Sequence, residues 1–193
     1  LKLEISERER RRAITAKDLL PAPDASPWSA DELAVLEPAI DEGNRFLGWA
    51  HGGRNMFLTG MAGTGKSTLL RGFIGESVAS GRRVDVTAPT GVAALNVGGM
   101  TLHRFCGMRL GPKAGQSDEA FYRELKEERH PAVMAGFRRV RNCEVLVIDE
   151  VSMLPGRILN FVDFLFCQVR DCDAPFGGCQ VIATGDFLQL PPV

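Results

Sequence analysis

The chain has 193 residues, of which 45% are hydrophobic and 24% charged, and its formal net charge is −1. This length and balance fit one globular α/β domain with a short extension, and they exclude two complete domains, a disordered chain and a fibrous repeat. No apolar run approaches the roughly 18 residues that a membrane span needs, and residues 1–12 lack the apolar stretch of a signal peptide. We therefore expect an intracellular protein without a membrane partner.

Charge is distributed unevenly along the chain. Residues 54–100 carry +3 and residues 101–141 carry +4, whereas residues 21–53 and 142–193 each carry −5. The basic middle offers a place for a polyanion, although the nearly neutral chain has little overall attraction for nucleic acid. The five cysteines have spacings that match no zinc pattern, so we expect reduced, mostly buried thiols.

Residues 1–27 predict an extension that precedes the main domain. The first 20 are dense in charged helix formers and predict a helix exposed on most faces, or alternatively an arm that docks or touches DNA. Three prolines in the rest of this segment predict an extended linker. Ser29, with Glu32 three residues later, fits a capping box and predicts the start of the first helix of the next domain. We therefore assign one domain to residues 28–193.

Short apolar runs then alternate with helical stretches. Four runs rich in Val, Ile, Phe and Leu predict buried strands, over Asn55–Thr59, Arg83–Ala88, Glu144–Ile148 and Gln180–Thr184. Helices are predicted between them, over Lys66–Ala79, Gly91–Val97, Glu119–Arg139 with a break at Pro131, and Gly156–Val169. This alternation predicts an α/β fold, with a mostly parallel sheet and helices on both of its faces.

A glycine-rich loop follows the first predicted strand and opens a helix. Its residues are Gly60, Met61, Ala62, Gly63, Thr64, Gly65, Lys66 and Ser67, with Thr68 next in the helix. The pattern predicts a phosphate-binding loop, because glycines let backbone N–H groups turn toward a triphosphate and the helix N-terminus adds positive potential. We expect Lys66 to reach the β- and γ-phosphates and the Ser67 hydroxyl to bind Mg²⁺.

Two carboxylates follow a later buried strand. Asp149 and Glu150 come directly after Glu144–Ile148, at the carboxyl end where ligands of open α/β sheets bind. We expect Asp149 to hold Mg²⁺ and Glu150 to orient and deprotonate the attacking water. The last predicted strand leads into a proline-stiffened turn, where Gln189 is placed to touch the γ-phosphate or its water. Taken alone, it could equally be a surface glutamine.

Two further segments favour nucleic-acid binding. A helix begins within Pro89-Thr90-Gly91, so its free N–H groups could bind a backbone phosphate. Downstream, His103-Arg104-Phe105 combines an aromatic ring with polar and cationic neighbours, as single-strand binders do. Composition alone favours a buried Phe105 and a structural His103.

Five motifs in this order resemble those of the Pif-one family of superfamily-one DNA helicases. They are Phe57–Ser67, Ala88–Ala94, Thr101–Phe105, Ile148–Met153 and Gly185–Val193. The resemblance covers residues 28–193 and implies the first RecA-like P-loop NTPase domain of an ATP-driven motor that moves 5'-to-3' on single-stranded DNA. It implies ATP and Mg²⁺ as cofactors, and a second RecA-like domain with arginine fingers outside these residues.

The resemblance also implies roles for single residues. Lys66, Ser67 and Asp149 would hold the nucleotide and the metal, and Glu150 would activate the attacking water. Gln189 would sense the γ-phosphate. The residues that would face DNA are Pro89, Thr90, Gly91, His103, Arg104 and Phe105. Two features depart from the family pattern. Glu32 stands where the family has a glutamine that reads adenine. The family's signature segment, here Glu150–Arg170, has only Arg157 and Arg170 as cations, which weakens the case for a DNA contact there.

Two other classes of protein share part of this pattern. A nucleotide or small-molecule kinase would follow its phosphate loop with an acceptor-binding lid, where this chain has a Gln-Leu-Pro-Pro turn after a strand. A nucleotide-dependent DNA-binding switch would have the same site but would not unwind DNA. The chain starts at Leu1 and stops at Val193, which suggests more protein on both sides. A DNA helicase is expected in the cytoplasm or nucleoid, or in the nucleus or mitochondrion of a eukaryote.

Overall fold

The computed structural model describes residues 42–61 and 63–187. Four predicted features lie outside these residues: the extension over residues 1–27, the helix start at Ser29 and Glu32, the loop residue Ala62, and the turn that contains Gln189.

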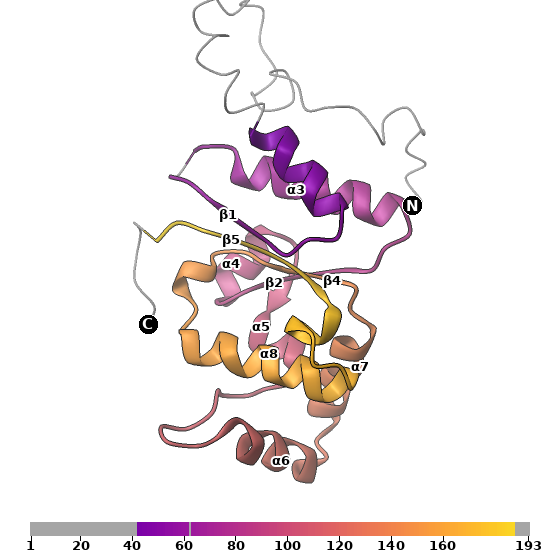
Figure 1. Cartoon of the computed structure of the whole chain (residues 1–193). Helices are drawn as coiled ribbons and strands as arrows, with labels where there is room; N and C mark the ends of the chain where they lie inside the picture. The colour runs from indigo at the N-terminus through magenta and orange to yellow at the C-terminus, as the bar shows by residue number, and fades with distance from the viewer. Residues whose placement is uncertain (1–41, 62, 188–193) are drawn as a thin grey trace, which may run out of the picture.

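Five parallel strands form one sheet with the order β1-β5-β4-β2-β3 (Figure 1). They are β1 (Met56–Thr59), β2 (Val84–Ala88), β3 (Met100–Thr101), β4 (Val145–Ile148) and β5 (Gln180–Gly185). The four predicted strands are confirmed to within one residue at each end, and so is the parallel arrangement. The third strand was not predicted, because two residues are too short to show a hydrophobic period.

Helices connect successive strands. They are α3 (Lys66–Ala79), α4 (Gly91–Asn96), α5 (Leu102–Cys106), α6 (Asp118–Glu128), α7 (Pro131–Asn142) and α8 (Gly156–Arg170), and residues 42–51 are also helical. The bounds of α3 are those predicted. The predicted break at Pro131 separates α6 from α7, and the proline is the first residue of α7, where its missing N–H costs nothing. The five-residue α5 was missed for the same reason as β3.

Helix α3 and the helix over residues 42–51 cover one face of the sheet, α5, α7 and α8 cover the other, and α6 lies beyond α8 (Figure 1). Strand β4 shows why the sheet is buried on both faces, since successive side chains of a strand alternate. Val145 and Val147 pack toward α3 and the helix over residues 42–51, whereas Leu146 and Ile148 pack toward α5, α7 and α8. All four side chains are fully buried.

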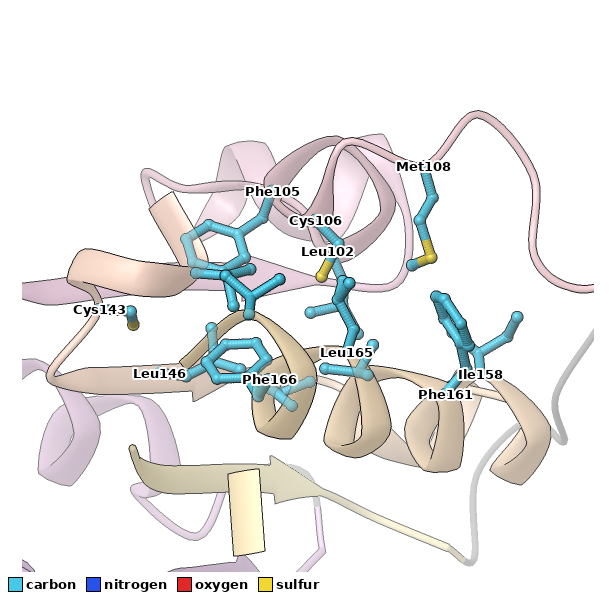
Figure 2. Close-up of a cluster of buried hydrophobic side chains, with 14 of the residues drawn as sticks. Leu102, Phe105, Cys106, Met108, Cys143, Leu146, Ile158, Phe161, Leu165 and Phe166 are labelled. Atoms are coloured by element: carbon cyan, nitrogen blue, oxygen red, sulfur yellow. The ribbon is translucent and has the colours of Figure 1, made fainter. Parts of the chain in front are cut away.

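The larger core lies between the sheet and α5, α7 and α8 (Figure 2). The rings of Phe105 and Phe166 stack there with centroids 6.3 Å apart. Helices α5 and α7 approach closely at Gly136, where a Cβ would lie 2.4 Å from the carbonyl carbon and oxygen of Cys106. Glycine is therefore required at this crossing.

The five cysteines are all free thiols, and Cys106, Cys143 and Cys179 are buried. No helix in the described part of the chain is long and apolar enough to cross a bilayer. A further short turn, the 3-10 helix η2 (Val151–Met153), follows β4 and leads toward α8.

Candidate active site

The glycine-rich loop joins β1 to α3, and its lysine is folded back onto the loop. Gly63 and Gly65 have φ angles of +81° and +87°, a left-handed conformation that favours glycine. The Lys66 ammonium donates hydrogen bonds to the carbonyl oxygens of Gly60 and, at 2.8 Å, of Met61. This places a cation against the first residues of the loop.

The N-terminus of α3 keeps its positive potential. The cap residue Gly65 supplies no side-chain hydrogen bond, and the first turn of α3 contains no acidic residue. The first N–H groups of a helix have no partner within the helix, and their aligned dipoles favour an anion. The 14-residue α3 therefore presents an end that suits a phosphate group.

The two carboxylates after β4 occupy different surroundings. The Thr184 hydroxyl on the neighbouring strand β5 donates a hydrogen bond to Oδ1 of Asp149, which fixes the orientation of that carboxylate. Glu150 has a φ of +52°, a left-handed conformation that is uncommon outside glycine. Burial raises the pKa of Glu150, as do the carboxylates of Asp149 and Asp186, against the opposing effect of the Lys66 ammonium. A raised pKa makes this carboxylate a better proton acceptor.

A cavity of about 440 Å³ brings several predicted residues together. Ser67 from the start of α3, Thr90 from the start of α4, and Asp149 and Glu150 from the end of β4 all line it. The register explains the meeting, because β4 is paired with β2 on one side and β5 on the other, and their carboxyl ends reach the same edge of the sheet. The cavity therefore joins the loop and the carboxylates to the segment predicted to face DNA.

Three polar residues of this region were not singled out from the sequence. Arg71 and Asn96 line the cavity, and Thr184 bonds Asp149. Arg71 follows Ser67 by four positions in α3, which places the two side chains on the same face of the helix. That spacing is the sequence signal for Arg71, and the position at the end of a buried strand is the signal for Thr184. Asn96 has no comparable signal in the sequence.

The segment Pro89-Thr90-Gly91 is positioned at the start of α4, as predicted. Gly91 is exposed and Pro89 half-buried. The Thr90 side chain accepts a hydrogen bond of 3.2 Å from the Ala93 N–H, so that donor of the helix end is already satisfied. The expectation that free N–H groups hold a phosphate here therefore applies to fewer groups than the sequence suggested.

The three residues His103, Arg104 and Phe105 lie in α5 but do not share one surface. Phe105 is fully buried (Figure 2), which corrects the expectation that its ring faces DNA and agrees with what composition favoured. His103 is half-buried, and burial lowers its pKa. Arg104 is exposed, while its carbonyl oxygen and that of Phe105 accept hydrogen bonds from Arg139 of α7.

The two cations of the signature helix bind other parts of the protein. Arg157 pairs with Asp118 and donates to the carbonyl oxygen of Gln116 at 2.8 Å. The Arg170 guanidinium donates to four carbonyl oxygens, those of Val140, Arg141, Cys143 and Gly177. Both guanidinium groups thus have structural partners, in line with the weak case for a DNA contact on α8.

Fold and site together define a class of protein. The sheet is parallel with helices on both faces, a phosphate-binding loop follows β1, and an acidic pair follows β4, with β5 between these two strands. This is a RecA-like P-loop NTPase domain.

Comparison with known proteins places the domain more narrowly. Residues 45–193 match the PIF1-like helicase family. The ATP-dependent DNA helicase PIF1 of Saccharomyces cerevisiae (strain YJM789) is 44% identical over 146 residues, which are 75% of this chain and 16% of the yeast protein. The crystal structure of Pif1 helicase from Candida albicans has a TM-score of 0.69 at 41% identity, over 79% of this chain and 33% of that chain. The Pif1 helicase from Bacteroides, solved with ADP-AlF3 and ssDNA, has a TM-score of 0.65 at 35% identity, with the same coverage.

This chain therefore belongs to the PIF1-like helicase family, which confirms the resemblance drawn from its motifs. It spans a third or less of the length of these three relatives.

Proposed function

We propose that this chain is the first RecA-like domain of an ATP-dependent DNA helicase that moves 5'-to-3' along single-stranded DNA. The observation that carries the proposal is the cavity lined by Ser67, Thr90, Asp149 and Glu150. It connects residues suited to nucleotide hydrolysis with the segment suited to DNA. Such a connection is what a motor needs in order to link ATP turnover to movement on a strand.

The side chains present fit a magnesium ion. The Ser67 hydroxyl and the Asp149 carboxylate offer oxygen donors to the same cavity. Mg²⁺ is typically held by one or two carboxylates together with substrate phosphates, so a single protein carboxylate is sufficient. Ser67 and Asp149 would hold the ion, and Thr184 would keep the Asp149 carboxylate in place. When bound, Mg²⁺ supplies charge neutralisation for the β- and γ-phosphates.

The remaining residues of the site divide the work of hydrolysis. Lys66 would leave the loop carbonyls and move to the β- and γ-phosphates, where its charge is needed. Glu150, whose pKa is raised, would orient the attacking water and accept its proton. The loop from Gly60 to Gly65 would wrap the phosphates with its N–H groups. Gln189 would sense the γ-phosphate and Glu32 would lie near adenine, both of which stay predictions from the sequence.

DNA would pass over α4 and α5. Thr90 and Gly91 at the start of α4, together with the exposed Arg104, are the described residues that we place toward the strand. His103 is a weaker candidate because it is half-buried. The stimulation of hydrolysis would need a second RecA-like domain of the same protein, whose arginines would complete the site. Such arginines contribute about 10³ to 10⁵ in rate in other NTPases.

The decisive experiment measures ATP hydrolysis and strand separation by the full-length protein. We expect hydrolysis to rise strongly with single-stranded DNA, and unwinding of a duplex with a 5' overhang but not of one with a 3' overhang. A kinase would ignore DNA, and a binding switch would hydrolyse slowly with or without it. Either of these results, or unwinding from a 3' overhang, would overturn the proposal. We expect the protein to be located with DNA, in a nucleoid, a nucleus or a mitochondrion.

Residues 1–193 alone provide a second test. We expect them to bind Mg-ATP weakly and not to unwind a duplex, because the arginines of the second domain are missing. Robust DNA-stimulated turnover by this segment would instead indicate a self-sufficient site or a dimer.

A further inference from the structure

A groove between α6, α7 and α8 has no role in the proposed motor. Two adjoining hollows, of about 650 and 610 Å³, share Tyr122, Lys126, Arg129 and Gln168 and so form one continuous feature, which we call the α6–α8 groove. Helix α6 lies at the opposite side of the molecule from α3 and its phosphate-binding loop (Figure 1). A ligand in this groove would therefore leave the nucleotide cavity open.

The floor of the groove is apolar and built from rings that support one another. Tyr122 of α6 stacks on Phe137 of α7 with centroids 5.7 Å apart, and it meets Phe164 of α8 edge-on at 6.1 Å. Met134 of α7 also lines the groove and is 50% exposed. Each ring contacts another helix, so the floor is held in place by the packing of three helices and is formed before any partner arrives.

The second hollow is lined by positive charges that no acidic lining residue neutralises. Lys126, Arg129 and Arg141 line it, and no acidic residue does. Within residues 42–61 and 63–187, none of these three cations forms an ion pair. The acidic residues of α6 that are paired have other partners: Asp118 with Arg157, Glu124 with Lys113, and Glu128 with Arg109. The second hollow thus carries three positive charges, and the only carboxylates among the described residues that line the groove, Glu119 and Glu127, lie in the first hollow.

We propose that the α6–α8 groove is a docking site for an acidic segment of a partner protein that carries a large apolar side chain. The apolar side chain would cover Met134 and the ring edges, which burial favours by removing them from water. The carboxylates of the segment would lie against Lys126, Arg129 and Arg141, where opposite charges steer association and fix the register. Because the groove lies away from the cavity at Ser67, the partner would hold the motor in place without blocking ATP.

A nucleic-acid strand fits the groove less well, for two reasons. Glu119 and Glu127 line the first hollow and would repel a continuous phosphate backbone. A peptide can bring its carboxylates to the second hollow alone. In addition, Tyr122 is already stacked on Phe137 and has the Lys126 ammonium 5.4 Å from its ring centre, so a base would have to compete with both contacts in order to stack on this ring.

The test uses a fluorescein-labelled synthetic peptide with several Asp residues around one Trp and one Leu, and measures its fluorescence anisotropy with the full-length protein. A peptide with Asn in place of each Asp is the probe control. We expect the acidic peptide to bind, and Arg141→Glu to weaken binding about tenfold or more, since like charges meet where opposite charges did. Met134→Ser should also weaken it.

Arg138→Glu is the matched protein control. It changes the charge by the same amount, and Arg138 is exposed on the same helix but does not line the groove. It should bind the peptide like the parent. DNA-stimulated ATP hydrolysis should be equal in all variants, which shows that they are folded. The proposal fails if the acidic peptide does not bind, or if Arg141→Glu and Arg138→Glu weaken peptide binding equally. It also fails if oligo(dT) displaces the peptide from the parent protein and binds the Arg141→Glu protein less tightly. The last result would make the groove a nucleic-acid site.

Discussion

The Thr184 hydroxyl on β5 donates a hydrogen bond to Oδ1 of Asp149, the first residue after β4. Thr184 is 1% exposed, so water cannot readily replace the bond. Two neighbouring strands thus cooperate to orient the carboxylate that we assign to the metal.

Thr184→Val keeps the shape of the side chain but removes this donor. We expect the fold to survive with a loss of about 1.5–3 kcal/mol, the usual scale for a lost hydrogen bond to a charged group. Mg-ATP affinity should fall because Asp149 is no longer held. Thr184→Ser, which retains the hydroxyl, should behave much more like the parent. Unchanged Mg-ATP affinity in Thr184→Val, measured by calorimetry, would show that the bond does not position Asp149.

Lys66→Ala and Glu150→Gln should separate nucleotide binding from hydrolysis. Lys66→Ala removes a charge whose described contacts are loop carbonyls, so we expect an intact fold and a collapse of ATP affinity. Glu150→Gln retains size and most hydrogen bonds but loses the base, so hydrolysis should fall while ATP still binds. Both are measured in the full-length enzyme. Equal hydrolysis by Glu150→Gln and its parent would remove Glu150 from its assigned role.

Replacing a glycine with alanine should lower the stability of the protein in one helix and raise it in another. In Gly136→Ala the new Cβ would lie 2.4 Å from backbone atoms of Cys106, so α5 and α7 must separate, and we expect a loss of about 2–4 kcal/mol. In Gly75→Ala, inside α3, the Cβ meets nothing within 4 Å, and stability should rise by about 0.5–1 kcal/mol. Urea unfolding measures both. A neutral Gly136→Ala would mean that the two helices yield easily.

Arg170 should matter for stability and not for DNA. Its guanidinium bonds four carbonyl oxygens, three of them through part-buried bonds, so Arg170→Met should leave several partly buried acceptors unpaired and cost about 2–4 kcal/mol. Arg138→Met, at an exposed position of α7, is the control and should change stability by less than about 0.5 kcal/mol. At temperatures where both proteins are folded, their affinity for single-stranded DNA should equal that of the parent. A selective loss of DNA affinity in Arg170→Met would instead place this cation in the DNA path.

Glu32 should weaken the discrimination between ATP and GTP. A glutamine amide can accept from the adenine N6 amino group and donate to N7, whereas a carboxylate only accepts. We expect Glu32→Gln to improve the preference for ATP by up to about 1–3 kcal/mol, the scale of one bidentate base contact. Hydrolysis of both nucleotides by the full-length enzyme and this variant is the measurement. If the parent already rejects GTP and the variant does not differ, Glu32 is only a helix cap.

Local sequence was sufficient wherever a run of residues specifies its own structure. Strand β4 was predicted because its four residues are all apolar, and a short apolar run of this kind between turn signals is typical of a buried strand. Strands β2 and β5 were predicted because short runs rich in valine and isoleucine favour a strand. The loop from Gly60 to Ser67 was recognisable because left-handed glycines and a helix start must follow one another in the chain. The family followed from the order of such local motifs.

Only the tertiary structure decided which side chains are exposed and which distant residues meet. Phe105 and Arg104 are neighbours in α5, yet one is fully buried and the other exposed, because the packing of α5 against α7 and α8 fixes the rotation of the helix. The bond from Thr184 to Asp149 depends on β4 and β5 being adjacent in the sheet, although 35 positions separate the two residues. The α6–α8 groove needs three helices at once. Pairings of this kind depend on the register and crossing of elements, which no local pattern encodes.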